Sequence, residues 1–237
     1  MANNHRVVSS AEWIEARKEL LAKEKVFTQL RDQMSQQRRE LPWERVEKQY
    51  VFDGAGNKPT LAQLFAGKSQ LIVYHFMFDP AWEAGCKSCS FWADNFNGID
   101  IHLKHRDISF VAISRAPLPK LEAYKKRMGW NFKWVSSFNN DFNFDFNVSF
   151  TPEEVANGNA QYNYTRQKPG DSEAVGISVF YKDPDEQIFH TYSCYQRGVD
   201  LMNGAYNYMD LTPKGRDEAD QKPGTQAWVR RHDEYDA

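Results

Sequence analysis

Near the N-terminus, apolar residues recur every seven positions within a segment rich in Glu, Lys, Arg and Gln. The stripe consists of Trp13, Leu20, Phe27 and Met34. This spacing predicts one long amphipathic helix that begins at a serine cap, Ser9 or Ser10, and ends before Pro42. Its stripe either packs on the rest of the chain or forms an arm that binds a second copy. Three heptads do not decide between these two interpretations.

Beyond residue 44, short apolar runs alternate with segments of helical spacing. LIVYHFMF (71–78) is almost continuously apolar, as expected of a strand that is buried on both faces. Alternation of this kind predicts a parallel core sheet with helices on its faces. The expected strands are 46–52, 71–78, 108–114 and 132–137, and the expected helices are 59–67, 90–106 and 118–129.

The second half of the chain begins with a polar stretch, 138–173, which is poor in aliphatic residues and predicts a loop-rich insertion. Two runs of strand type follow at 176–183 and 188–195, separated by a PDEQ turn, and they predict a β-hairpin. The segment 198–211 predicts a final helix.

These patterns predict three parts. Residues 1–44 form an N-terminal helical arm, 45–211 form the main domain, and 212–237 form a tail that packs on that domain. The charged segment RRHDEY (230–235) is expected to dock through ion pairs, and its spacing excludes the HExxH pattern of zinc proteases.

Charge and hydropathy limit the partners. The net charge is −2, and basic residues are dispersed among acids, so no nucleic acid or anionic membrane partner is expected. No run approaches the roughly 18 apolar residues of a membrane span, and no signal-peptide pattern opens the chain. The expected compartment is therefore the cytoplasm, where the three cysteines stay mostly reduced.

The segment GCKSCSFW (85–92) carries the strongest chemical signal. Cys86 follows a strand and a loop and stands at a predicted helix start, where free N–H groups and the helix dipole favour a thiolate. Lys87 adds a positive charge, and such surroundings lower a thiol pKa to about 3.5–7.5. Cys89, one turn later, can resolve the mixed disulfide or sulfenic acid that Cys86 forms.

Two other interpretations of the cysteine pair stay open. Both thiols can be buried and inert, or they can contribute to a structural metal site. A zinc site needs four ligands, and the chain has no second CxxC, while His102 and His105 lie well along the predicted helix. No metal and no cofactor are expected.

A strand, a CxxC at a helix start, a β-α-β continuation and a terminal hairpin with a helix together resemble the thioredoxin fold. The segment DGAGNKPTLAQLFAGKSQLIVYHFMF is also similar to the entry of peroxiredoxin-type members of that fold. Nearly the whole chain resembles the bacterial thioredoxin-like family catalogued as domain of unknown function 899. The matching stretches are EWIEARKELLAKEK, LPWERVEKQYVF, LIVYHFMFDPAWEAGCKSCSFWADNF, ISRAPLPKLEAYKKRMGW, FNFDF, HTYSCYQRGVDLMNGAYNYMDLTPKGRDE and WVRRHDEY. The resemblance implies an α/β thioredoxin-like sandwich with a mixed central sheet, and it assigns no substrate.

The chain departs from the thioredoxin and peroxiredoxin patterns at two places. Thioredoxins carry a cis-proline before the strand that faces the CxxC pair, whereas EAVGISVF has Gly176 there. Peroxiredoxins carry a proline and a Thr or Ser before the reactive cysteine, but no Thr or Ser stands between Pro80 and Cys86. These departures weaken a general protein-disulfide role and a standard peroxidase role.

Two arginines are candidates for substrate binding. Arg115 follows a parallel strand, at the edge where open α/β sheets bind ligands. It can hold an anionic substrate, stabilise the thiolate or form an ion pair only. Arg197 follows the hairpin and has the same alternatives.

Other candidates flank the pair or are expected to face it. Trp82 and Trp92 can wall a small-molecule pocket or simply pack in the core. His190 lies mid-strand and can neighbour the cysteines or be a structural histidine. Cys194, four residues further on, is expected on the same face as His190 and as a small buried side chain.

The sequence therefore predicts a thiol–disulfide or peroxide-reducing oxidoreductase in which Cys86 attacks and Cys89 resolves. Its expected partners are a small-molecule or protein thiol or disulfide and a cellular thiol reductant, with a homodimer through the N-terminal helix as a further expectation. The alternatives are a non-catalytic binding protein of thioredoxin fold and a structural metal site at the CxxC.

Overall fold

A computed structural model describes residues 5–222 and 224–235, and the chain divides into two compact units after Pro42. The first unit contains helix α1 (Ser10–Glu40). The Ser9 side chain accepts a hydrogen bond from the Glu12 backbone N–H, and the Glu12 carboxylate accepts one from the Ser9 backbone N–H, which is a complete capping box. The predicted long helix is confirmed. No residue of α1 is buried, and its stripe of Trp13, Leu20, Phe27 and Met34 is exposed.

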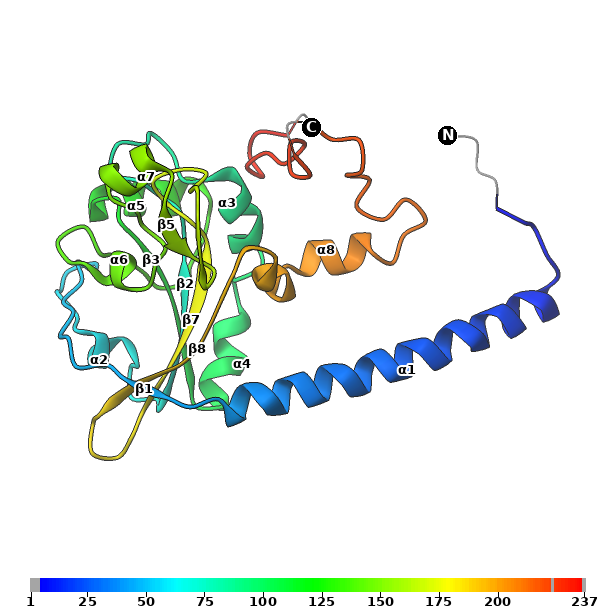
Figure 1. Ribbon diagram of the computed structural model, residues 1–237, viewed down its shortest axis with the longest axis horizontal. Helices are drawn as coiled ribbons and strands as arrows, with labels where there is room; N and C mark the ends of the chain where they lie inside the picture. The colour runs from blue at the N-terminus through cyan, green and yellow to red at the C-terminus, as the bar shows by residue number, and fades with distance from the viewer. Residues whose placement is uncertain (1–4, 223, 236–237) are drawn as a thin grey trace. The chain divides into compact units, whose positions relative to one another are not determined.

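The second unit is built on a six-stranded sheet with the order β1-β8-β7-β2-β3-β4 (Figure 1). Strands β2, β3 and β4 are parallel, and β7 pairs antiparallel with both β2 and β8. The predicted α/β class and its mixed central sheet are confirmed. The strands are β1 (Glu44–Arg45), β2 (Gln70–His75), β3 (Ile108–Ser114), β4 (Trp134–Ser136), β7 (Gly176–Lys182) and β8 (Ile188–Tyr195).

Successive residues of β2 point to opposite faces of the sheet and divide the core in two. Leu71 and Val73 pack in one core with α2 and α6, whereas Tyr74 packs in the other with α3 and α5. Figure 1 shows α2 and α6 on one side of the sheet and α3 and α4 on the other. The helices are α2 (Leu61–Leu64), α3 (Lys87–Ala93), α4 (Ile99–His105), α5 (Leu118–Arg127) and α6 (Phe142–Asp145).

Three predicted elements differ from the structure. The prediction of a strand at 46–52 is wrong. Tyr50 and Phe52 fill the core by packing on the Phe142 ring, while the backbone of this segment makes only isolated bridges. The helix expected at 90–106 is broken into α3 and α4 at Gly98, whose φ of 85° lies in the left-handed region. The helix expected at 198–211 is a 3₁₀ turn, η1 (Gln196–Met202), followed by α8 (Gly204–Met209).

The segment 138–173, expected as a loop-rich insertion, contributes to a small third core. It contains α6, α7 (Pro152–Asn157) and a two-stranded sheet of β5 (Ala160–Tyr162) and β6 (Thr165–Gln167). Buried Val148, Phe150 and Tyr162 pack together with Tyr195 of β8. Aromatic residues thus replace the aliphatic residues whose scarcity indicated loops.

Candidate functional site

Cys86 is the N-cap residue of α3, at the end of the loop that leaves β2. Its backbone N–H donates to the Met77 carbonyl over 3.1 Å. Its own carbonyl accepts bonds from the Ser90 N–H at 2.9 Å and from the Ser90 hydroxyl at 2.8 Å. These bonds fix the turn that carries the thiol, and they leave the side chain half-buried.

Cys89 lies one turn along α3 and is buried, with 2% of its surface exposed. The two cysteines are 3.9 Å apart and are not bonded to each other. No disulfide joins Cys86, Cys89 or Cys194 to another cysteine. The pair is therefore close enough to form a disulfide after a modest rearrangement, because a disulfide requires about 2 Å between its sulfurs.

The two thiols differ in acidity. The neighbouring Cys89 thiol is the largest influence on Cys86 and helps to lower its pKa to about 7. Burial opposes this effect, whereas the backbone N–H groups of Cys89 and Ser88 and the charge of Arg231 support it. Burial raises the pKa of Cys89 well above its ordinary value. As pH rises through neutrality, Cys86 therefore ionises first, while Cys89 stays protonated.

A cavity of about 350 Å³ opens beside both cysteines. Its walls are mostly apolar, and polar groups gather at its edge. The buried Tyr74 hydroxyl lines it and interacts with the Cys89 thiol. The cavity is lined by Tyr74, Met77, Cys86, Ser88, Cys89, Trp92, Val175, Gln196, Arg197, Val199, Asp200 and Gln226. An apolar pocket with a few polar groups is the form that small-molecule sites take.

The sequence matches a family model for bacterial proteins of unknown function, DUF899, over residues 2–235. The chain belongs to this family. The resemblance seen in the sequence is thereby confirmed. Among curated proteins, no sequence matches this DUF899 member significantly.

Solved structures similar to this DUF899 chain include peroxidoxin BcpB from Mycobacterium tuberculosis, with 14% identity and a TM-score of 0.45 over 68% of this chain and 93% of that one. A cysteine variant of peroxiredoxin Q from Xanthomonas campestris has 13% identity and a TM-score of 0.47 over 71% and 98%. A putative thiol-disulfide oxidoreductase from Bacteroides vulgatus has 14% identity and a TM-score of 0.38 over 65% and 90%.

The structure brings two of the sequence candidates to the cysteine cavity. Trp92 and Arg197 both line it. Trp92 is buried, and its indole N–H donates to the Val199 carbonyl over 2.8 Å. Arg197 is largely exposed and pairs with Asp200 over 2.9 Å at the cavity edge. Lys87 lies next to Cys86 in the chain, and Trp82 packs against the core that contains Cys89.

Arg115 is engaged in an internal ion-pair cluster. Its guanidinium bonds Glu173 at 2.6 Å and Asp79 at 2.9 Å, and it stacks 4.8 Å from the Phe144 ring centroid. Glu173 is buried and also accepts a bond from the Ser149 hydroxyl. Burial raises the pKa of Glu173 to about 7, although Arg115 acts in the opposite direction. The cluster ties the loop after β2 to the segment that leads into β7.

His190 and Cys194 lie on opposite faces of β8, so the expectation that they share a face is wrong. A β-bulge gives Thr191 no partner in β7: Phe180 pairs with His190, but Val179 pairs with Tyr192. The extra residue reverses the alternation. Cys194 therefore packs in the core that contains Cys89, whereas His190 contacts the rings of Phe146 and Phe180 in the other core.

Sequence reasoning missed most of the cavity lining, including Tyr74 and Gln226, and it missed the nearby Arg231. Tyr74 belongs to the central strand that was recognised, but the direction of its hydroxyl depends on the packing of α3. Gln226 and Arg231 come from the C-terminal tail, more than a hundred residues after the cysteines. The charged segment at 230–235 was the only signal for Arg231, and it indicated docking without a location.

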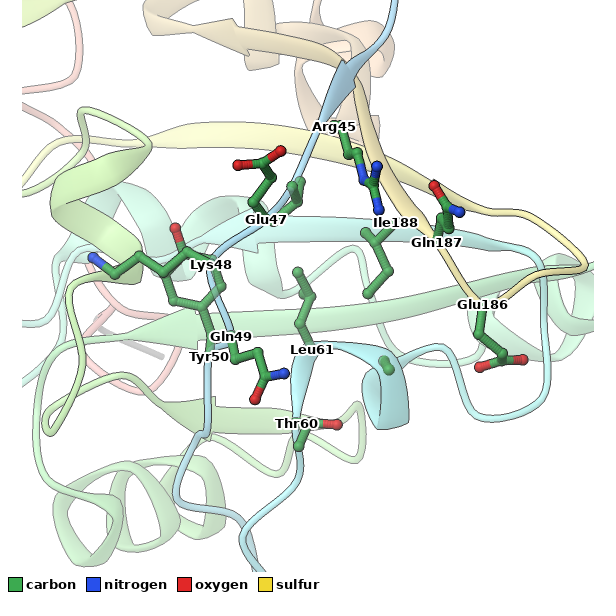
Figure 2. A pocket seen from close by; sticks show the side chains of 12 residues that line it. Arg45, Glu47, Lys48, Gln49, Tyr50, Thr60, Leu61, Glu186, Gln187 and Ile188 are labelled. Carbon is green, nitrogen blue, oxygen red and sulfur yellow. The ribbon is translucent and has the colours of Figure 1, made fainter.

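A second cavity, of about 540 Å³, lies along the segment 45–50. Figure 2 shows it between this segment, Thr60 and Leu61, and the turn at 186–188. Acidic and basic side chains surround it, and no thiol contributes to it. The cysteine cavity is therefore the better candidate for redox chemistry.

Within residues 5–222 and 224–235, no three His, Cys, Asp or Glu side chains gather as ligands for a metal ion. The alternative of a structural metal at the CxxC thus finds no ligand set there. Across the same residues, no helix is long and apolar enough to cross a bilayer.

Proposed function

We propose that this protein is a thiol–disulfide oxidoreductase in which Cys86 is the nucleophile and Cys89 resolves. The observation that carries the proposal is the pair itself. Two free thiols lie 3.9 Å apart beside an apolar cavity, and their pKa values shift in opposite directions. A thiolate next to a protonated thiol is the arrangement that disulfide exchange requires.

The reaction with a disulfide RSSR has two steps. The Cys86 thiolate attacks one sulfur, forms a Cys86–SR mixed disulfide and releases RS⁻, which takes a proton from solvent. The Cys89 thiol then loses its proton and attacks the Cys86 sulfur, and a second RSH leaves. The products are the Cys86–Cys89 disulfide and two thiols, and a dithiol reductant restores the pair. A peroxide would give the same disulfide through a sulfenic acid at Cys86.

We propose a small-molecule disulfide as substrate. The cavity of about 350 Å³ has the size of a small-ligand pocket. Gly176 opens β7, and a Cβ added to it would lie 2.8 Å from Tyr195 and 3.0 Å from Val148. Gly176, which stands where thioredoxins carry a proline, is therefore closely packed and leaves no room for a side chain. This supports a substrate that binds inside the cavity. Because the cycle needs re-reduction by thiols, we also propose the reducing cytoplasm as its location.

The proposal predicts the pH dependence of Cys86 alkylation. The pKa of a thiol that is lowered to about 7 places the inflection of the rate near that pH, since only the thiolate reacts. The measurement is the rate of iodoacetamide labelling of Cys86 in reduced, chelator-treated protein, read by mass spectrometry from pH 5 to 10. An inflection at or above the free-thiol value of about 8.5 would instead favour a non-catalytic binding protein.

We further propose that residues 1–44 are an arm through which two copies of the chain pair. The exposed stripe on α1 supports this, because a helix with an exposed apolar stripe gains stability when a second helix packs on that stripe. The expected result is a dimer in sedimentation equilibrium at micromolar concentration and a monomer for the variant L20E/F27E. As a matched control, Lys18→Glu and Lys25→Glu lie off the stripe and should leave the mass unchanged. A monomeric wild-type protein would contradict the proposal.

A further inference from the structure

The C-terminal segment 226–235 is anchored on the helices around the cysteine pair. Val229 is fully buried, and the Trp228 ring packs 5.5 Å from the Phe91 ring of α3. Asp233 pairs with Arg127 of α5 over 2.7 Å. His232 Nδ1 lies 2.7 Å from the Asp94 carboxylate, at the end of α3. In the structure, the segment lies against α3 and α5 through these ion pairs and ring contacts.

Arg231 stands in the middle of this anchored segment and contacts the turn that carries Cys86. Its Nη2 donates to the Gly85 carbonyl and its Nε to the Tyr124 hydroxyl, both over 2.8 Å. Its Nη1 pairs with Glu234 over 2.8 Å. Only 20% of the side chain is exposed, so the guanidinium is held in one place.

A chain of hydrogen bonds continues from Arg231 to Cys86 itself. The Ser90 hydroxyl donates to the Cys86 carbonyl over 2.8 Å. Ser90 therefore accepts from the Tyr124 hydroxyl, 2.8 Å away, and Tyr124 in turn accepts from Arg231. Each group in this series of hydrogen bonds donates to the next one, from Arg231 towards the Cys86 carbonyl. Arg231 thus holds the carbonyl before Cys86 directly and the carbonyl of Cys86 through two side chains.

The turn has little freedom to adjust without these contacts. A Cβ added at Gly85 would lie 2.7 Å from the Phe76 ring and 2.9 Å from the Tyr124 ring. The chain therefore passes very close to both aromatic rings just before the thiol. A small shift of Tyr124 or of the tail would be transmitted to Cys86.

We infer that Arg231 is a positioning residue for Cys86: it holds the turn that carries the thiol and supplies the positive charge that favours its thiolate. This inference rests on the proposed function, in which Cys86 attacks. The other titratable groups at the site are Cys89 and Tyr74 within the cavity and Arg197 and Asp200 at its edge. Arg197 and Asp200 pair with each other, whereas the Arg231 charge is among the influences that lower the pKa of Cys86.

The test is the pH midpoint of Cys86 alkylation in Arg231→Gln, with Arg230→Gln as the matched control. Among residues 5–222 and 224–235, the Arg230 side chain donates to the Ala227 and Val229 carbonyls and to no atom of the cysteine turn. We expect Arg231→Gln to raise the midpoint by about 0.5–1 pH unit, which slows labelling at pH 6 by roughly three- to tenfold. Arg231→Lys, which keeps the charge, should recover part of this loss. Arg230→Gln should match the wild type.

A second variant keeps the inference testable if Arg231→Gln does not fold. Tyr124→Phe keeps the ring but removes the hydroxyl that links Arg231 to Ser90, and it should raise the midpoint by a smaller amount. The inference is overturned if the wild-type midpoint lies near 7 and the folded Arg231 or Tyr124 variants share it. It is also overturned if Arg230→Gln shifts the midpoint as much as Arg231→Gln. A wild-type midpoint of 8.5 or more would be a different outcome, because it would refute the proposed function itself.

Discussion

Cys86→Ser is expected to abolish reaction with small disulfides, with a loss of at least roughly a thousandfold in rate. A serine hydroxyl is not ionised near neutral pH, and the remaining cysteine at the site, Cys89, is buried and has a raised pKa. The measurement is the rate at which 2-hydroxyethyl disulfide is consumed when a dithiol reductant is present in excess over the protein.

Cys89→Ser should behave differently from Cys86→Ser. The first attack remains, so a mixed disulfide should accumulate at Cys86 and appear in the intact mass. Cys194→Ser is the matched control, because Cys194 is buried and its thiol donates to the Gly198 carbonyl over 3.4 Å. Full activity in Cys86→Ser, or a comparable loss in Cys194→Ser, would assign the chemistry to another group.

Arg115→Met is expected to destabilise the fold by about 2–4 kcal/mol near pH 8. Glu173, with 1% of its side chain exposed, would lose its cation, so it must either stay buried as an unpaired carboxylate or take up a proton, and both destabilise the fold at this pH. Arg115 itself is one-fifth exposed, which reduces the effect below that of a fully buried pair. Urea denaturation of the variant and the wild type gives the difference in the free energy of unfolding.

The pH dependence of Arg115→Met separates this cause from a simple loss of packing. The pKa of Glu173 is already raised to about 7 by burial in the folded protein, and removal of the cation raises it further. A folded-state pKa above the unfolded value stabilises the fold at low pH, and this contribution is lost as pH rises toward the folded value. The variant should therefore be closest to the wild type near pH 5. Adding Glu173→Gln should restore much of the stability at pH 8, and equal losses at both pH values would contradict the explanation.

The sequence predicted the parts of the site that depend on local order. Cys86 and Cys89 lie three positions apart in the chain, and an apolar strand followed by a short loop was sufficient to place them at a helix start. The same local reasoning predicted the hairpin of β7 and β8. It failed at the bulge near Thr191, because one extra residue in a strand leaves no mark in an alternating pattern and yet reverses the side chains beyond it.

The long-range side-chain contacts around the site could not be predicted from the sequence. Arg231 reaches Gly85 and Tyr124 only because the tail folds over α3 and α5, and nothing in RRHDEY specifies those partners. Arg115 was correctly placed after its strand, but its partners Asp79 and Glu173 are 36 and 58 residues away. The break between α3 and α4 is different, since Gly98 was a visible local signal that the helical spacing around it outweighed.

The most direct test of the redox pair is to map the cysteines of the reduced wild-type protein after reaction with one equivalent of 2-hydroxyethyl disulfide. The account predicts a Cys86–Cys89 disulfide, with a mass loss of about 2 Da relative to the reduced protein and a free thiol at Cys194. Native protein that keeps all three thiols, or that links Cys194 instead, would contradict a redox function for this pair.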